Sequence, residues 1–361
     1  MRIGSIKEDL NLEQRIAVTP EIIKKYKSLE LSIILPKGYG KHLGISDQEF
    51  INEGAEILDG EEKVLSEADV VLQMNLISEK NFEKLKNETF LIGVLNPYSN
   101  KEKLNKLLDK KINCFSLELL PRITRAQSMD ILSSQANLAG YKAVIDSFAY
   151  YQKAIPMMMT AAGTIPAARV LVVGAGVAGL QAIATAKRMG AIVYETDVRL
   201  ASKEQVESLG AKFVFVESEE SLETEGGYAK EATEDYKKKQ EELMKQTVKN
   251  QDVVITTALI PGKKAPLIIT EEMVLSMKPG SIICDLATSQ GGNVAFSEKD
   301  KIVEKNGVKI IGYSNYASRT AYSASGLLAK NIINFLSLLV DKETKSLKID
   351  FEDEIIKGVR I

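Results

Sequence analysis

The chain of 361 residues contains only two cysteines, Cys114 and Cys284, each inside an apolar run that is typical of a buried strand. Two separated thiols exclude a disulfide framework and a thiolate metal site. We therefore expect free thiols in a reducing, cytoplasmic environment and no bound metal.

An excess of basic residues is equally absent. Lys and Arg number 47 against 49 Asp and Glu, the formal net charge is -2, and the basic residues are dispersed along the chain. Nucleic-acid-binding surfaces need clustered Lys and Arg. We expect no nucleic-acid partner.

The sequence also lacks a run that is apolar enough to cross a bilayer. The N-terminal MRIGSIKED carries early charges, which excludes a signal peptide. The most apolar stretch, SASGLLAKNIINFLSLLV, is interrupted by Lys330, Asn331 and Asn334. We expect no direct insertion of this chain into a membrane.

What the sequence does contain is a regular alternation of strand-like and helix-like segments. In the first third, the strand candidates are MRIGSI, LSIILP, ADVVLQM, TFLIGVL and INCFSLELL, with amphipathic helical stretches between them. From about Ala167, six more candidates follow: ARVLVVGAG, AIVYETD, KFVFV, DVVITTA, SIICDLA and VKIIGYS. Strict alternation predicts βαβ units. The predicted class is α/β, with two Rossmann-like, doubly wound parallel-sheet domains and a cleft between them.

The domain boundaries are predicted from two long helical patterns. One, SSQANLAGYKAVIDSFAYYQKA, connects the two alternating series, and the last helix, near 323–339, is expected to return to the first domain because the tail has no sheet of its own. We predict an N-terminal domain of residues 1–135 plus 323–361 and a second domain of residues 136–322.

Residues 217–250 form a connection far longer than is usual between strands and helices of α/β units. Its second half has helical spacing, and Gly226, Gly227 and Tyr228 lie in a polar, acidic surround. A solvated loop followed by a surface helix is one interpretation. A mobile lid that closes on a ligand is the other, and the sequence leaves both open.

A glycine-rich turn predicts a nucleotide site in the second domain. Gly174, Gly176 and Gly179 spell G-x-G-x-x-G between a strand and a helix. In such turns the first glycine permits the tight bend, the second lets a pyrophosphate approach the backbone, and the third lets helix and strand pack closely. The free N–H groups of the helix N-terminus then face the anion.

Asp197 ends the next strand, where a carboxylate accepts hydrogen bonds from the adenosine ribose. Its charge would repel a 2′-phosphate and therefore favours NAD(H) over NADP(H). Arg199, two residues later, weakens that preference.

No obvious proton carrier accompanies this site. The single histidine, His42, lies in a glycine-rich loop without an adjacent acid, and we expect it to be exposed to solvent. Oxidation of an alcohol or amine requires a proton acceptor, whereas hydride transfer between two nicotinamide rings moves no proton at the reacting carbons. The absence of an obvious base is therefore consistent with hydride transfer between two nicotinamide rings.

Several long motifs carry a resemblance to a known family. They are PRITRAQSMDILSSQANLAGY, MMMTAAGTIPAARVLVVGAGVAGLQAIATAKRMGA, KEQVESLGAKF, GGYAKE, TTALIPGKKAP and ITEEMVLSMKPGS. They resemble the NAD(H)-binding domain of proton-translocating nicotinamide nucleotide transhydrogenase, over nearly the whole chain. Alanine dehydrogenases share the fold and the early pattern IGSIKED…EQRIAVTPE, which includes Arg15, but their catalytic lysine and histidine align with Asn75 and Asn96 here.

The resemblance implies roles for particular residues. The segment that contacts the nicotinamide and its ribose would carry the catalytic set Arg122, Gln127, Asp130 and Ser133, with Gln127 reaching toward the second nicotinamide. The cofactor-binding set would be Gly174, Gly176, Val177, Ala178, Gly179, Asp197, Val198, Tyr228, Thr257, Ala258 and Leu259, with Tyr228 at the tip of a mobile loop. An ordinary ion pair between Arg122 and Asp130 is an alternative.

The resemblance further implies a Re/Si-specific transhydrogenase that is active only with its partners. This chain would bind NAD(H) as a homodimer, without a metal. An NADP(H)-binding beta subunit and membrane-spanning chains would attach it peripherally to the inner membrane from the cytoplasm. A stand-alone amino-acid dehydrogenase and a non-catalytic NAD-binding module remain alternatives. Roles for Arg15 and His42 stay open.

Overall fold

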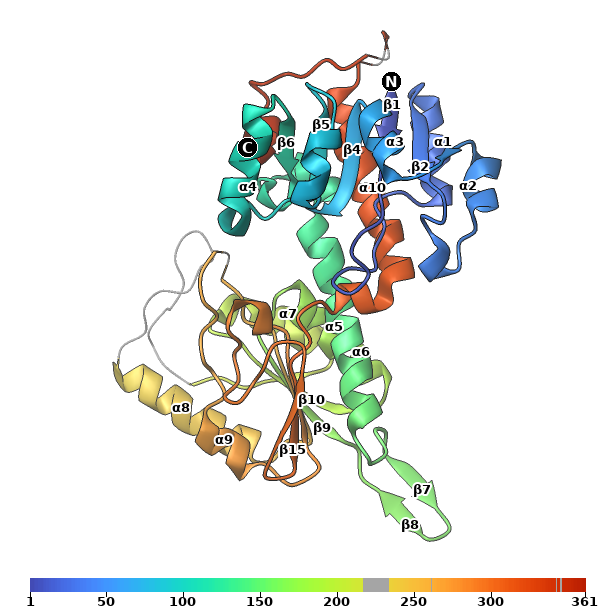
Figure 1. The fold of residues 1–361 in the computed structure, drawn as a ribbon. Coiled ribbons are helices and arrows are strands. Elements are labelled where there is room, and N and C mark those ends of the chain that lie inside the picture. The colour runs from blue at the N-terminus through green and yellow to red at the C-terminus, as the bar shows by residue number, and fades with distance from the viewer. Residues whose placement is uncertain (217–233, 261, 342, 345) are drawn as a thin grey trace. The chain divides into compact units, whose positions relative to one another are not determined.

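The computed structural model describes residues 1–216, 234–260, 262–341, 343–344 and 346–361. These residues divide into two compact units (Figure 1). Unit 1 consists of Met1–Gln135 together with Ala317–Ile361, and unit 2 is Ala136–Tyr316. The GGYAKE motif with Tyr228, and the first half of the long connection, lie outside the described residues.

Unit 1 is built on a six-stranded sheet in the order β3-β2-β1-β4-β5-β6, with parallel pairing throughout. Its strands are β1 (Arg2–Gly4), β2 (Ser32–Pro36), β3 (Glu56–Leu58), β4 (Val70–Asn75), β5 (Phe90–Val94) and β6 (Asn113–Ser116). The sequence pattern missed β3 because this edge strand is three residues long and only Leu58 is buried. The strand order reverses between β1 and β4, as in a doubly wound fold.

Helices cover both faces of this sheet. They are α1 (Pro20–Ser28), α2 (Asp47–Glu53), α3 (Glu61–Glu67), α4 (Pro97–Asp109), α10 (Ala321–Leu339) and α11 (Glu354–Val359), with short 3-10 turns η1 (Lys41–Leu43), η2 (Glu79–Lys84), η3 (Leu117–Leu119), η4 (Thr124–Met129) and η7 (Ala317–Thr320). Leu72 of β4 packs in one cluster with Phe335 of α10, whereas its neighbour Val71 belongs to the opposite cluster with Leu65 of α3. Burial on both faces explains the continuous apolar runs that the strands show.

The C-terminal segment completes unit 1. α10 packs into its core, and the backbone N–H of Ile361 donates to the carbonyl of Cys114 in β6 (3.0 Å). Residues more than 200 positions apart in the sequence are therefore neighbours in one core.

Unit 2 carries a seven-stranded sheet in the order β11-β10-β9-β12-β13-β15-β14. Its strands are β9 (Arg169–Val173), β10 (Ile192–Thr196), β11 (Lys212–Phe213), β12 (Val253–Thr256), β13 (Ile282–Asp285), β14 (Ile302–Lys305) and β15 (Val308–Ile311). All six predicted strands are present. The antiparallel edge strand β14 was missed, since its mostly exposed IVEK lacks an apolar run.

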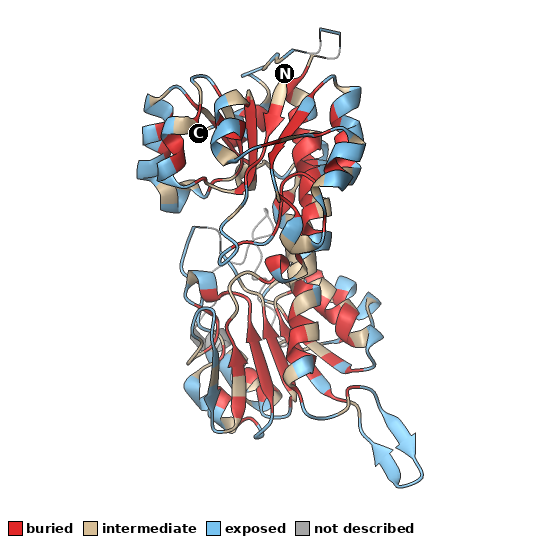
Figure 2. Cartoon of the chain, turned by 45° about the vertical axis from the view of Figure 1, so that its right-hand side comes forward, coloured by how far each residue is buried: buried red, intermediate tan, exposed pale blue. Residues whose placement is uncertain are grey.

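The helices of unit 2 again form two layers. They are α5 (Ile131–Tyr150, which starts in unit 1), α6 (Val177–Arg188), α7 (Lys203–Ser208), α8 (Glu234–Val248) and α9 (Glu271–Ser276), with η5 (Leu200–Ser202) and η6 (Thr288–Gln290). Figure 2 shows the central strands buried between them. The predicted class, two α/β domains with parallel sheets, is confirmed.

A two-stranded hairpin, β7 (Met158–Thr160) with β8 (Gly163–Ile165), lies apart from both large sheets. Every residue of the two strands is exposed, as Figure 2 shows. The sequence pattern did not predict this hairpin, because its MMT and GTI segments are too short to register as strands.

Gly140 sets how closely α5 approaches the first turn of α6. A Cβ at Gly140 would lie 2.0 Å from the carbonyl oxygen of Ala178, which is backbone and has no flexible side chain to move. The two helices can approach this closely only because residue 140 has no side chain.

Two helical glycines should therefore respond oppositely to substitution by alanine. We expect Gly140→Ala to lower the free energy of unfolding of the chain by about 2 kcal/mol, because one helix must shift. Gly326→Ala in α10 adds a Cβ that meets no heavy atom within 4 Å. This change should raise the free energy of unfolding by about 0.5–1 kcal/mol, because the unfolded chain loses the extra backbone entropy of glycine. Urea unfolding measures both, and equal effects of the two changes would contradict the packing argument.

Candidate nucleotide-binding site

Two glycines of the G-x-G-x-x-G motif, Gly174 in the turn after β9 and Gly179 in the first turn of α6, are required by the protein itself. Gly174 has a φ of +101°, and a Cβ there would lie 2.7 Å from Oγ1 of Thr257. A Cβ on Gly179 would lie 1.7 Å from the carbonyl oxygen of Gly174. The turn and the first turn of α6 are thus packed backbone against backbone.

Gly176 is different, because nothing in the described part of the chain explains why it is glycine. Its φ of -75° suits any residue, and an added Cβ would meet no heavy atom within 4 Å. It is the N-cap of α6, and no side chain caps that helix end. The open space at a bare helix N-terminus fits a close-lying pyrophosphate of a dinucleotide.

Asp197 follows β10 and is held against this turn. Its Oδ2 accepts from the N–H of Ala175 (2.7 Å) and from Nη2 of Arg199 (2.9 Å), and its Oδ1 accepts from N and Nε of Arg199 (2.8 and 3.0 Å). Burial would raise the pKa of Asp197, but the hydrogen bonds, led by the Arg199 side chain, hold it below its usual range. The carboxylate is therefore ionised at neutral pH.

Glu195 is a second carboxyl close to Asp197, and the sequence pattern did not single it out. It lies on the sheet face of Val193 and is fully buried, and neither of its oxygens has a hydrogen-bond partner within the described ranges. Burial, reinforced by the charge of Asp197 and opposed by Arg199, raises the pKa of Glu195 to about 8. The carboxyl of Glu195 is therefore neutral at pH 7. In the sequence, only the position of a glutamate in an otherwise apolar strand could have drawn attention to it.

The segment after β12 adjoins the glycine turn. Thr257 donates from Oγ1 to the carbonyls of Val173 and Gly174 (3.1 Å each). Ala258 is held by Asn293, whose Oδ1 accepts from the Ala258 N–H (3.1 Å) and whose Nδ2 donates to its carbonyl (2.9 Å). The structure thus brings residues of the predicted cofactor set together from two separate motifs.

Two residues outside the predicted set position this segment. Asp285, fully buried at the end of β13, accepts from the N–H of Asn293 (2.9 Å) and from Oγ1 of Thr256 (3.2 Å). Burial raises the pKa of Asp285. Polar residues at the carboxyl ends of adjacent parallel strands meet at one edge of the sheet. The motifs SIICD, which ends with Asp285, and GGN, which ends with Asn293, could therefore have identified these two residues from the sequence.

The remaining predicted cofactor contacts differ in exposure. Val177, Val198 and Leu259 are exposed apolar side chains, Ala178 is half-buried, and Tyr228 lies outside the described residues.

The predicted catalytic segment belongs to unit 1. Arg122 and Gln127 are exposed. Asp130 precedes α5 and accepts from the N–H and Oγ of Ser133 (2.9 and 2.5 Å). No ion pair joins Arg122 to Asp130, both of which the structure describes, so that alternative is wrong.

Two asparagines of α10 hold this segment in place. Nδ2 of Asn331 and Nδ2 of Asn334 both donate to the carbonyl of Ser128 (2.9 and 3.0 Å). These two asparagines interrupt the apolar pattern of α10, which argued against a membrane span. In the structure they hold the carbonyl of Ser128.

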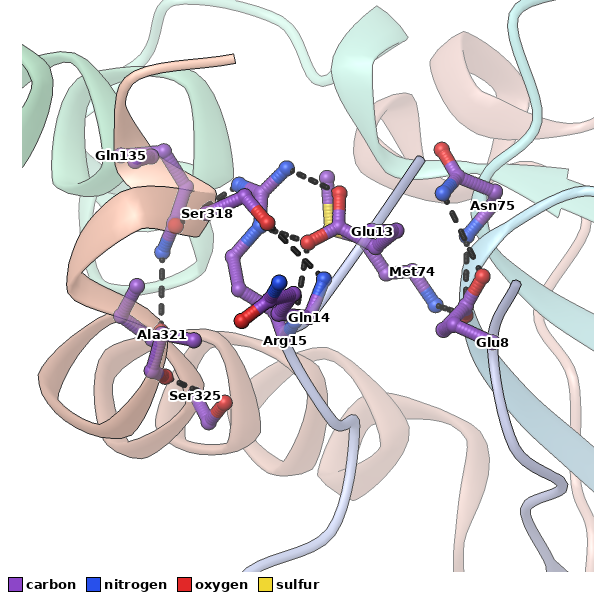
Figure 3. Close-up of polar contacts among 12 residues, drawn as sticks. Glu8, Glu13, Gln14, Arg15, Met74, Asn75, Gln135, Ser318, Ala321 and Ser325 are labelled. Carbon is purple, nitrogen blue, oxygen red and sulfur yellow. Dashed lines mark hydrogen bonds and ion pairs between the residues drawn. The ribbon is translucent and has the colours of Figure 1, made fainter. Parts of the chain in front are cut away.

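A second polar cluster of unit 1 contains Asn75, one of the two positions at which the resemblance to the family predicts that a base is missing (Figure 3). Asn75 donates from N to Oε1 and from Nδ2 to Oε2 of Glu8 (3.2 and 3.3 Å). Burial raises the pKa of Glu8 to about 7, while hydrogen bonds from Asn75 and Met74 oppose this shift. Asn96 occupies the N-cap position of α4 with a left-handed φ of 49°, and its side chain makes no capping hydrogen bond. Neither amide side chain is a base.

Arg15 is buried in the same cluster (Figure 3). Its Nε and Nη2 donate to the two carboxylate oxygens of Glu13 (2.8 and 2.6 Å), and its Nη1 donates to Oε1 of Gln135 (2.8 Å). The guanidinium is thus engaged in joining the N-terminal loop to α5, which answers the open question about its role in structural terms.

His42 is not the exposed side chain that was expected. It is half-buried in η1, and its Nε2 lies 2.7 Å from the carbonyl oxygen of Gln14. The glycine-rich context indicated a loop correctly, but the loop folds onto the neighbouring segment.

Two kinds of feature are absent from the described residues. None of the helices in these ranges combines the length and apolarity needed to span a lipid bilayer. No group of three or more His, Cys, Asp or Glu side chains there is arranged to hold a metal ion.

Unit 2 defines the chain as a protein of the dinucleotide-binding α/β class, because a glycine turn follows the first strand of its sheet and a carboxylate follows the second. The sequence matches the family models "Alanine dehydrogenase/PNT, N-terminal domain" over residues 4–139 and "Alanine dehydrogenase/PNT, C-terminal domain" over residues 143–361. The chain belongs to this alanine dehydrogenase/PNT family.

Within the family, the chain is more similar to transhydrogenase subunits than to alanine dehydrogenase. It is 51% identical over 365 residues to an NAD(P) transhydrogenase alpha subunit of Rhodospirillum rubrum, covering 99% of this chain and 95% of that one. A crystal structure of transhydrogenase from Sinorhizobium meliloti matches with a TM-score of 0.91 and 46% identity, covering 100% and 98%. Alanine dehydrogenase of Methanococcus maripaludis is 27% identical, covering 99% and 92%. The resemblance to transhydrogenase is confirmed.

Glu195 should make the stability of the chain depend on pH. Its pKa is about 8 in the folded state against 4.5 for the ordinary group, so its contribution to stability is complete below pH 4.5 and is lost as pH rises through 8. The loss is on the order of a few kcal/mol. Glu195→Gln does not titrate, and its free energy of unfolding should therefore rise relative to the parent chain from pH 4.5 to pH 8.

Urea unfolding at a series of pH values measures this difference. Glu204→Gln, an exposed glutamate of α7, is the matched control and should follow the parent chain throughout. Parallel profiles of the parent and Glu195→Gln would show that Glu195 is ionised in the folded state.

Proposed function

We propose that the chain is the NAD(H)-binding component of a Re/Si-specific, proton-translocating transhydrogenase. It exchanges hydride directly between its own NAD(H) and NADP(H) held by a partner beta subunit. The observation that carries the nucleotide half of this proposal is Gly176, a glycine that the described protein atoms do not require, at an uncapped helix N-terminus beside Asp197. The transhydrogenase half is supported by the names of the relatives.

The cofactor set divides by chemistry. N–H groups of the turn at Gly174, Gly176 and Gly179 and of the first turn of α6 would hold the pyrophosphate, and Asp197 would take the adenosine ribose. Thr257, Ala258 and Leu259 would line the nicotinamide side. We keep Tyr228 as a residue of a closing loop in this proposal.

The proposed reaction suits the groups that are present. Bound NAD(H) supplies the hydride donor or acceptor, and the C–H bond broken on one ring is formed on the other, so no side chain has to move a proton. An amino-acid dehydrogenase needs a base, and Asn75 and Asn96 offer none. Glu8 titrates near neutrality, but its carboxylate already accepts hydrogen bonds from Gln73, Met74 and Asn75.

The work left to this chain is positioning. We assign Gln127 to contact the second nicotinamide and Arg122, Asp130 and Ser133 to hold the first nicotinamide and its ribose. Asp130 and Ser133 are already fixed to each other, while the exposed Arg122 and Gln127 remain accessible to a partner. Orientation of two rings with water excluded lowers the barrier without acid–base chemistry.

The assembly belongs to the same proposal. Residues 136–322 would act as the NAD(H)-binding domain, and residues 1–135 with 323–361 as the second domain. The chain would be a cytoplasmic homodimer attached peripherally to the inner membrane through membrane-spanning partners. The exposed hairpin supports the dimer, since Met157, Met158, Met159 and Ile165 present apolar side chains on it. Sedimentation that detects only monomer at micromolar concentration would contradict this assembly.

A cyclic assay tests the function. The purified chain is mixed with an NADP(H)-loaded transhydrogenase partner domain, NADH and an oxidised NAD analogue, and reduction of the analogue is followed by absorbance. We expect turnover that needs both proteins. Gln127→Asn should reduce the rate by on the order of tenfold or more through misplacement, whereas Gln48→Asn, on the exposed surface of α2, should not.

Binding of NADH to the chain alone, followed by fluorescence, separates the two halves of the proposal. Gly176→Ala should weaken binding while leaving urea unfolding unchanged, because its Cβ touches only ligand space. Tight NADH binding without turnover in the assay would favour a non-catalytic NAD-binding module. NADH formation from alanine by the chain alone would favour the amino-acid dehydrogenase.

A further inference from the structure

Gln127 lies on a segment that depends on the rest of unit 1 for its conformation. It belongs to η4, a run of six residues in 3-10 geometry. Hydrogen bonds of a 3-10 helix are poorer than those of an α-helix, and runs of this length are uncommon. The preceding Ala126 is buried in the core of unit 1, whereas Gln127 is exposed. The orientation of the Gln127 amide therefore depends on the contacts that hold η4 in place.

On the N-terminal side of Gln127, the segment is attached to α11 through Arg125. Nη1 of Arg125 donates to Oδ2 of Asp353 and Nη2 donates to Oδ1 (2.7 and 2.8 Å). Asp353 is also the N-cap of α11, and its Oδ1 accepts from the N–H of Ile355 (2.8 Å). The hydrogen bonds from Arg125 lower the pKa of Asp353, so the pair is ionised at neutral pH. Two parallel charge-assisted hydrogen bonds fix direction as well as distance.

On the C-terminal side of Gln127, the segment is attached to α10 through the carbonyl of Ser128. Nδ2 of Asn331 and Nδ2 of Asn334 donate to this carbonyl (2.9 and 3.0 Å). Asn331 is buried, and its Oδ1 accepts from Oγ of Ser134 in α5 (2.7 Å). One amide group thus holds the backbone both before and after Asp130.

We propose that Asn331, Asn334 and Asp353 are positioning residues for Gln127, which fix the backbone on both sides of it and so orient its amide toward the second nicotinamide. The inference rests on the proposed function, in which Gln127 contacts that ring. The three residues lie 203 to 228 positions further along the chain than the groups they hold. None of them is assigned a contact with a nucleotide, so their effect on the reaction passes through Gln127.

Two substitutions release the segment, one on each side of Gln127. Asp353→Ser removes the carboxylate that Arg125 binds but keeps a side-chain oxygen that can cap α11. Asn331→Leu combined with Asn334→Leu removes both donors to the carbonyl of Ser128. Leucine has nearly the volume of asparagine and suits an apolar helix, so we expect the chain to fold.

A third substitution is the matched control. Lys357→Ala breaks an exposed ion pair with Glu352 (2.6 Å) at α11 that does not include η4. Surface ion pairs contribute about 0–1 kcal/mol to stability. Neither this variant nor Asp353→Ser should therefore change urea unfolding strongly, and a difference between them in hydride transfer reports on η4.

The experiment measures the cyclic rate at saturating partner domain together with NADH binding to the chain alone. We expect Asp353→Ser to lower the rate by about threefold and the double asparagine variant to lower it by about tenfold, because small displacements of reacting groups are costly. NADH binding by both variants, and the rate of Lys357→Ala, should stay within about twofold of the parent chain.

A Gln127→Ala background tests whether the effect passes through Gln127. That change removes the amide, and its own rate is the reference for this part of the experiment. In this background, Asp353→Ser and the double asparagine variant should lower the rate no further than about twofold, because residues that act through one group are not additive.

The outcomes separate the inference from the function on which it rests. Undiminished rates in the released variants, rates that fall in parallel with NADH binding, or full losses in the Gln127→Ala background each overturn the positioning role and leave the proposed function intact. A parent chain without turnover overturns both. If the asparagine variant no longer unfolds cooperatively, Asp353→Ser and Arg125→Ala, whose side chain is 54% exposed, decide by the same criteria.

Discussion

The close backbone contact between Gly174 and Gly179 is the constraint on which the candidate site depends. It brings the start of α6 so near to the end of β9 that no side chain fits at Gly179, while a positive φ and Oγ1 of Thr257 exclude a side chain at Gly174. The same turn is tied to β12 through Thr257 and to β10 through the bond between Ala175 and Asp197. A helix N-terminus, with its unpaired N–H groups and positive dipole end, is thereby fixed at the edge where three strands finish.

Two neighbouring carboxyls of this site differ in charge. Asp197 is kept ionised by its hydrogen bonds, and Glu195 behind it is kept neutral by burial and by the charge of Asp197. One negative charge is therefore present where two carboxyls lie close together, and Arg199 balances it. The hydrogen bonds from the Arg199 guanidinium to both oxygens of Asp197 are among the contacts that hold the pKa of this carboxyl low.

Buried polar contacts of unit 1 connect the N-terminal loop to the sheet and to α5. The amide of Asn75 serves as a donor to Glu8, and Arg15 is engaged by Glu13 and Gln135. These contacts tie the N-terminal loop to β4 and α5. Arg122 and Gln127, on the segment before α5, remain exposed.

The sequence alone determined the α/β class, the two series of parallel strands, the glycine turn with Asp197, and the family, because each follows from local periodicity or from a contiguous motif. It did not reveal the three-residue strand β3, the exposed β14 or the hairpin, whose segments are too short or too polar to carry a pattern. Only the tertiary structure decided which glycines the protein itself requires, that His42 folds onto Gln14, that Glu195 lies buried beside Asp197, and that Arg199 donates to both oxygens of that carboxylate. These are properties of atoms that folding brings together from different segments, or of side-chain directions that spacing along the chain does not specify.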